Sequence, residues 1–267
     1  METLAHVSSQ STSIVILIII FLVFCLGVLF SWYITKNATN KMLTALCFAA
    51  VLYGLTNFAS VTPSIFKDMN GLFFWVRMVM FTWMGTIMAL VFFAYTFPSY
   101  TFDLPKKKAI GIFVWMFGMM ILGVTPFVFS GMIVKDNIPA PVPNIGLVPY
   151  AITALGGIVW AGILFLKKGR RLVKTEPEST SIKCYILLSL TAFVYFFGQL
   201  IFNFIVVNAF KNSLYVQYGM VWSVPFIVAA AYAVAKRYEA LKIHWVLSQL
   251  LIIAMMFLLF VNIFLPY

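Results

Sequence analysis

Charged side chains are scarce in this sequence, and acidic ones are the scarcest. Charged residues make up 9% of the 267 residues, with seven Asp and Glu against 18 Lys and Arg. A soluble domain carries about 25% charged residues, so this chain lacks the charge needed to cover a globular surface. Apolar residues reach 63%, and the mean hydropathy is +1.03. The composition therefore excludes a soluble enzyme or a soluble binding domain.

Residues that bind metals or react are also rare. Cys25, Cys47 and Cys184 lie within or beside apolar runs without CxxC spacing, so we expect small core residues. The two histidines, His6 and His244, are far apart in the chain, which argues against a metal site. HExxH, GxSxG and paired-Asp signatures are missing, so we expect no enzymatic activity and no cofactor.

What the sequence does contain is long apolar runs of about 20 residues, the length that spans a hydrocarbon core of ~30 Å. Helices are expected, because each closes its own backbone hydrogen bonds in lipid. The runs are Ser13–Thr35, Met42–Val61, Leu72–Phe97, Ala109–Phe129, Leu147–Leu166, Ile182–Asn208, Leu214–Ala235 and Trp245–Pro266. We predict an all-α polytopic membrane bundle. Residues 1–12 would be an extracytoplasmic segment, 13–244 a seven-helix core, and 245–267 one additional C-terminal transmembrane helix.

The basic residues predict the orientation of these helices. Fourteen of the 18 fall in alternate loops, as the positive-inside rule requires of the cytoplasmic side. They are Lys36, Lys41, Lys106, Lys107, Lys108, Lys167, Lys168, Arg170, Arg171, Lys174, Lys183, Lys236, Arg237 and Lys242. The N-terminus is therefore expected outside. The net charge of +11 indicates the lipid bilayer as the partner and no nucleic acid, because the charges lie between apolar runs.

Two of the predicted loops differ in character. The outward loop Lys135–Asn144 holds three prolines in five residues, which predicts an extended, stiff lid. The longest cytoplasmic loop, Lys167–Lys183, is polar and basic, and we expect it mainly to anchor the topology.

Several local patterns together resemble one family. A short basic loop is followed by Leu43–Asn57, and the third helix opens with Phe74-Trp-Val-Arg77 and closes with Phe92-Phe-Ala-Tyr-Thr-Phe-Pro98. The seventh helix ends in an Ala-Tyr-Ala run that leads into basic residues within Trp222–Ile243. These features resemble the N-terminal seven-transmembrane sensor region of bacterial histidine kinases, from about residue 14 to 245. The resemblance implies a sensor of signal transduction in the bacterial inner membrane.

The chain departs from that family after His244. The family continues there into a dimerisation helix and an ATP-binding kinase domain, whereas this sequence enters the apolar run Trp245–Pro266. Neither a phosphoacceptor-histidine helix nor a glycine-rich ATP lid follows. The resemblance therefore implies a sensory half whose transmitter is missing or lies on another protein, such as a separate kinase. The sequence leaves the ligand and the oligomeric state open.

Arg77 is the most informative charge, because it lies about five residues into the third helix on the outer side. It could extend to the outer headgroups. It could instead form an electropositive group at the outer mouth of the bundle, where it binds an anionic ligand or holds a carbonyl.

Four further residues are candidates for sensing or motion. Gln199 and Asn203 are spaced i, i+4 and so share one face of the sixth helix, and Asn57 in the second helix is a possible partner. Such amides either join helices to one another or line a ligand pocket. Pro225, inside the expected seventh helix, predicts a kink and a candidate hinge.

We predict a membrane-embedded sensor or receptor-like module, with a small-solute transporter and a structural bundle as alternatives. No Asp or Glu lies in any apolar core, whereas ion-coupled carriers usually place one there. No internal repeat is visible, which also weakens the transporter hypothesis. Retinal is excluded because Leu214–Ala235 contains no lysine for a Schiff base.

Overall fold

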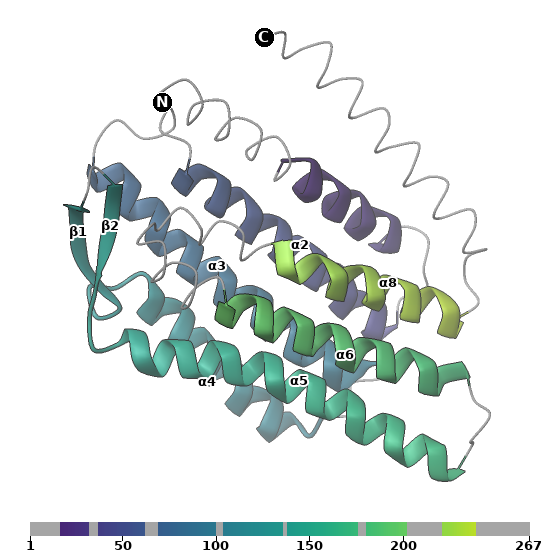
Figure 1. The fold of residues 1–267 in the computed structure, drawn as a ribbon. Coiled ribbons are helices and arrows are strands. Elements are labelled where there is room, and N and C mark those ends of the chain that lie inside the picture. The colour runs from purple at the N-terminus through teal and green to yellow at the C-terminus, as the bar shows by residue number, and fades with distance from the viewer. Residues whose placement is uncertain are drawn as a thin grey trace, which may run out of the picture.

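A computed structural model describes residues 17–31, 37–61, 69–99, 104–135, 138–175, 180–201 and 221–238. Within these ranges the chain forms seven helices and one β-hairpin, and the helices run alongside one another as a bundle (Figure 1). The helices are Leu17–Ser31, Ala38–Val61 (α2), Met69–Thr96 (α3), Lys106–Gly123 (α4), Leu147–Thr175 (α5), Thr180–Leu200 (α6) and Val224–Tyr238 (α8). The expected segments 1–12 and 245–267 lie outside the described residues, so the additional C-terminal helix stays a prediction.

Four of the described helices are long and apolar enough to cross a membrane. They are Ala38–Ser60, Met69–Thr96, Leu147–Val173 and Ile182–Leu200, with mean hydropathies of 1.4 to 1.8. Leu17–Ser31 and Val221–Lys236 are shorter apolar helices. The chain is a multi-pass helical membrane protein, as its composition predicts.

Five helices close a ring around the interior of the bundle. α2 packs on α3, α3 on α5, α5 on α6, α6 on α8, and α8 returns to α2. α4 lies outside this ring, where it packs mainly on α3 and more lightly on α5. Only Met116, Met119, Met120 and Gly123 of α4 are buried. The interior of the ring is therefore built without α4.

The close contact between α3 and α5 depends on Gly157. A Cβ atom at Gly157 would lie 2.6 Å from Ile87 Cγ2 and 3.2 Å from Met116 Cε. The adjacent Gly156 has no such neighbour within 4 Å. Of the two adjacent glycines, only Gly157 is thus required by packing.

The proline-rich loop Lys135–Asn144, expected to be an extended lid, instead forms part of a β-hairpin beside the helical bundle. β1 (Phe129–Lys135) pairs antiparallel with β2 (Ile138–Pro143). Pro139, Pro141 and Pro143 occupy every second position of β2. Successive residues of an antiparallel strand turn their N–H groups alternately toward and away from the partner. The three prolines can therefore all take the outward positions, and the ladder with β1 is kept.

α4 ends at Gly123, six residues before the Phe129 expected from hydrophobicity. Pro126 is the reason, since proline cannot continue a helix and disfavours helical geometry in the residue before it. The Thr125 hydroxyl donates to the Leu122 carbonyl at 2.7 Å and closes the end. The apolar residues that follow enter the turn and β1.

Most of the expected cytoplasmic loop is helical, and this too is a correction. α5 continues without a break from Leu147 to Thr175 and so includes Lys167–Lys174. The triplet Lys106–Lys108 likewise forms the first turn of α4. Lys and Arg are good helix formers, and at the C-terminal end of α5 they also complement the helix dipole. Hydrophobicity therefore predicted the apolar parts of these helices, but it did not predict the charged first turn of α4 or the charged end of α5.

The start of α4, the end of α5 and the end of α8, which carry Lys106–Lys108, Lys167–Arg171 and Lys236, lie at one end of the bundle, and the hairpin lies at the other (Figure 1). At the basic end the Thr39 hydroxyl, near the start of α2, donates to Thr96 O at the end of α3 (3.0 Å). At the hairpin end Arg77 of α3 contacts β1. We call these the basic end and the hairpin end. The orientation of these two ends in the membrane stays a prediction.

Candidate functional site

A cluster of polar and aromatic side chains fills the ring toward the hairpin end. Four helices contribute Tyr53 (α2), Trp83 (α3), Tyr150 (α5) and the pair Tyr195 and Gln199 (α6), and all are buried. We call these five residues the interior polar cluster. The Trp83 and Tyr150 rings lie 5.9 Å apart between centroids. Tyr53 hydrogen-bonds to Gln199, and the hydroxyls of Tyr53, Tyr150 and Tyr195 are electrostatic neighbours. None of the five carries a formal charge.

The members of this cluster differ in how well their polar atoms are satisfied. The Tyr150 hydroxyl donates to the Met80 carbonyl of α3. Trp83 Nε1 and Tyr195 Oη are neighbours, yet neither atom makes a hydrogen bond within the described structure. Both side chains are deeply buried, with Trp83 5% and Tyr195 1% exposed. The cluster therefore holds two buried polar atoms whose hydrogen-bonding capacity is unused.

The structure brings Gln199 into this cluster and buries Asn57 one turn beyond Tyr53 on α2. One residue before Asn57, the Thr56 hydroxyl lies 2.7 Å from that of Thr82 and joins α2 to α3. Asn203 falls outside the described residues, so its expected place beside Gln199 stays a prediction.

Toward the basic end the ring is filled by phenylalanine. Phe93 lies in the last turn of α3 and Phe97 directly follows α3. Phe165 of α5 and Phe226 of α8 pack against them, with ring centroids 5.7–6.3 Å apart. These four residues, the phenylalanine plug, are each 0–1% exposed. The interior therefore has two different halves. The half toward the hairpin end is polar, and the half toward the basic end is a layer of phenylalanine side chains.

Lys168 holds the end of α3 just beyond the plug. Its ammonium donates to Ala94 O at 2.8 Å, Tyr95 O at 2.9 Å and Phe97 O. The last carbonyls of a helix have no partner within the helix. A cation at this end also interacts favourably with the negative end of the helix dipole. Because Thr39 of α2 binds Thr96 O and Ser99 O nearby, three helices are joined at this point. The prediction that this region mainly anchors topology missed this contact.

Arg77 holds a carbonyl, one of the two functions expected for it at the outer mouth. Its Nη2 donates to Phe129 O, the first residue of β1, at 3.3 Å. The guanidinium carbon lies 3.9 Å from the centroid of the Phe73 ring, a cation–π contact. Arg77 therefore anchors the hairpin to α3.

Pro225 is the second residue of α8 and does not lie in a helix interior. Residues 221–223 form a 3₁₀ turn that passes directly into α8. In the first turn of α8 the missing N–H of proline has no intrahelical partner to lose. Residues 202–220 lie outside the described ranges, so the expected kink and hinge stay a prediction. Pro225 marks the change of helix type beside Phe226 of the plug.

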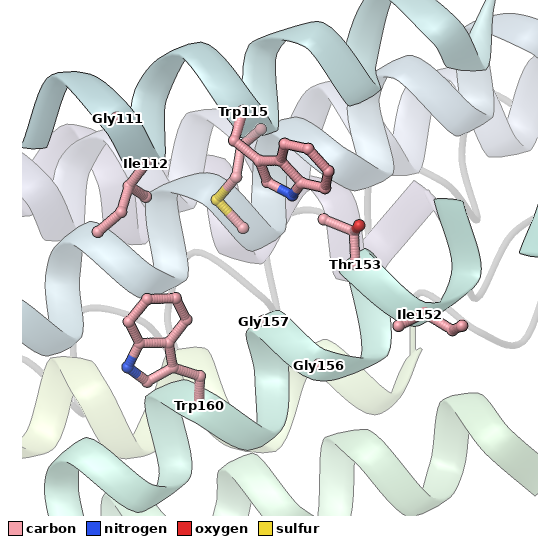
Figure 2. A pocket seen from close by; sticks show the side chains of 9 residues that line it. Gly111, Ile112, Trp115, Ile152, Thr153, Gly156, Gly157 and Trp160 are labelled. Atoms are coloured by element: carbon pink, nitrogen blue, oxygen red, sulfur yellow. The ribbon is translucent and has the colours of Figure 1, made fainter. Parts of the chain in front are cut away.

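A groove of about 400 Å³ lies outside the ring between α4 and α5 (Figure 2). Trp115 of α4 and Trp160 of α5 line it, together with Thr153 and several apolar residues. The Thr153 hydroxyl already donates to Pro149 O at 2.9 Å. The groove thus offers little polar chemistry for orienting a ligand, and the interior polar cluster is the better candidate site.

Of the five cluster residues, the sequence pointed only to Gln199. Tyrosine and tryptophan in a membrane protein usually lie at the two interfaces, so their presence in the sequence does not by itself indicate an interior site. Tyr53 and Trp83, however, lie well inside α2 and α3. A tyrosine or tryptophan near the centre of an apolar run is the signal that could have found them.

Comparisons with known proteins bear on the fold alone. No protein-family model and no curated protein matches the chain. Among solved structures, the crystal structure of squid rhodopsin is similar, with a TM-score of 0.50 and 11% sequence identity. The alignment covers 87% of this chain and 83% of that one. At this identity the similarity supports a rhodopsin-like helical membrane bundle and leaves the chemistry of the interior to its own residues.

Proposed function

We propose that this protein is a membrane-embedded sensor module of bacterial signal transduction, without catalytic activity of its own. In this proposal the bundle has seven core helices plus one C-terminal helix in the bacterial inner membrane. The N-terminus and the hairpin lie outside and the basic end is cytoplasmic, in accord with the positive-inside rule. The output partner is a separate kinase or another signalling protein.

The observation that carries the proposal is that polar side chains fill one half of the ring and phenylalanine side chains fill the other. Polar groups that four helices contribute face one another in the interior polar cluster, whereas the phenylalanine plug closes the way to the basic end. A site of this kind can respond to a ligand without passing it across the membrane. The resemblance of the sequence to histidine-kinase sensor regions supports the same function.

α3 offers a physical route from the site to the basic end. It carries Trp83 in the cluster, Phe93 in the plug and the carbonyls that Lys168 binds. A shift of α3 relative to α5 would change the plug and the Lys168 contacts together. The bistable element that a switch requires would then be the α3–α5 junction.

The test uses the full chain in its native host. We expect deletion of the gene to change the transcript profile, and Tyr195→Phe to change the same set of transcripts at an unchanged protein level. Tyr232→Phe is the control, because Tyr232 is 42% exposed on α8 and lies outside the cluster. Unchanged transcripts in the deletion strain would contradict a sensory function. Solute flux in proteoliposomes would then favour the transporter alternative.

A further inference from the structure

Trp83 Nε1 and Tyr195 Oη approach each other across the interior of the ring. They come from α3 and α6, and each of these helices packs on α5 on the way around the ring. A contact between Trp83 and Tyr195 therefore crosses the interior of the ring, and it is not part of the packing between two adjacent helices. Both side chains are more than nine-tenths buried, and neither polar atom has a hydrogen-bond partner.

Two such atoms are costly to leave unsatisfied. A buried donor without an acceptor costs about 1–3 kcal/mol, and bulk water does not reach the interior of a bundle in hydrocarbon. A direct bond from the indole N–H to the tyrosine oxygen would satisfy only one side, because the tyrosine O–H would still lack an acceptor. One additional acceptor atom between the two groups satisfies both.

The chemistry of that acceptor follows from the groups around it. The indole only donates, and the tyrosine hydroxyl has a hydrogen to donate, so the acceptor needs two lone pairs. The cluster contributes no formal charge, and an unpaired ion would pay a large desolvation cost there. A neutral oxygen atom meets both conditions.

We propose that Trp83 and Tyr195 together bind the oxygen atom of a neutral hydrogen-bond acceptor. The oxygen belongs either to an ordered water or to a hydroxyl or carbonyl group of a small neutral molecule. Tyr150 and Gln199 belong to the same cluster, but their hydroxyl and amide are already held by Met80 O and Tyr53. The bound oxygen links α3 to α6. The inference deepens the sensory function proposed above and rests on it for its biological role.

The experiment observes the Trp83 indole directly in the full-length protein in nanodiscs. Tryptophan is labelled with ¹⁵N in the indole ring, and the Trp83 signal is assigned by its loss in Trp83→Phe. A cross-peak between water and the Trp83 N–H identifies water as the ligand. If no such cross-peak is seen, mass spectrometry of the solvent extract should find about one small neutral molecule per protein. Either ligand should be lost in Tyr195→Phe, which removes one hydroxyl and keeps the ring.

Trp160→Phe is the matched control, because Trp160 lies in the outer groove and not in the cluster. It should leave the Trp83 cross-peak or the extracted molecule unchanged. The proposal is overturned if the wild-type protein shows neither a water cross-peak nor a bound molecule. It is also overturned if Tyr195→Phe leaves the ligand bound. Binding is measured on purified protein, so it can succeed or fail independently of the transcript test.

Discussion

At the scale of single residues, Lys168 shows how one partly buried charge can join two helices. An ammonium group has three hydrogens to donate, and three carbonyls at the end of α3 receive them. In the sequence Lys168 was one of six basic residues in a loop, and nothing in the spacing distinguished it from its neighbours. The contact depends on how far α5 continues as a helix, which the apolar run did not reveal.

We expect Lys168→Met to destabilise the protein by about 2–3 kcal/mol, because hydrogen bonds to charged groups each contribute about 1.5–3 kcal/mol and the variant leaves three carbonyls unpaired. Lys167→Met is the matched control, since Lys167 is adjacent and exposed. Thermal unfolding in nanodiscs measures both. Equal melting temperatures for the two variants would mean that the Lys168 contacts contribute nothing.

Arg77 makes a weaker but testable contact. Arg77→Met should lower the stability by about 1–2 kcal/mol, because it removes a cation–π contact and a bond to a carbonyl. The loss should appear first as faster hydrogen exchange at the amides of β1, which Arg77 anchors. Unchanged exchange in β1 would show that the hairpin holds its place without Arg77.

At the scale of elements, the two adjacent glycines of α5 test how α3 and α5 pack. Gly157→Ala should destabilise the bundle by about 1–3 kcal/mol, because the new methyl group overlaps Ile87 Cγ2 and a β-branched side chain has little rotamer freedom in a helix. Gly156→Ala should be neutral or stabilising, since alanine favours a helix over glycine by about 1 kcal/mol and nothing lies within 4 Å. Unfolding of both variants in the same lipid is the measurement. Equal effects would contradict a close α3–α5 contact at Gly157.

The elements also show what a sequence can predict here and what it cannot. Hydrophobicity located the apolar cores of α2, α3, α5 and α6, because each membrane-crossing helix must hold a long apolar run. It missed the charged extension of α5, where helix propensity decides the boundary. It also missed β1, because the apolar residues after Pro126 look like more of the same helix. The pairing of β1 with β2 depends on a partner strand, which single-segment hydrophobicity does not register.

At the scale of the whole molecule, the two ends of the bundle should face opposite sides of the membrane. Reporter fusions at residues 40, 105, 175 and 240 should all report a cytoplasmic location, and a fusion at Ile145, beside the hairpin, should report the outside. The physical reason is the retention of Lys and Arg on the cytoplasmic side. A cytoplasmic signal from the Ile145 fusion would overturn the proposed orientation.

The interior site could not be predicted as a whole, for a reason that also belongs to this scale. Gln199 stood out because an amide is rare in an apolar run, and the structure places it with Tyr53. Trp83 and Tyr195 are 112 positions apart in the sequence, and they meet only because five helices close into a ring. Period and composition describe one helix at a time and so do not show which residues face each other across the interior.

The alternating prolines of β2 have one further consequence, for how copies of this protein behave toward one another. A free strand edge recruits further strands through its outward N–H groups, which is how β-sheets polymerise between molecules. In β2 the outward positions can be filled by Pro139, Pro141 and Pro143, which have no N–H to offer. That edge presents carbonyl groups alone and cannot template a regular ladder. Strands of neighbouring copies therefore cannot extend the sheet along this edge where many copies crowd together on a membrane surface.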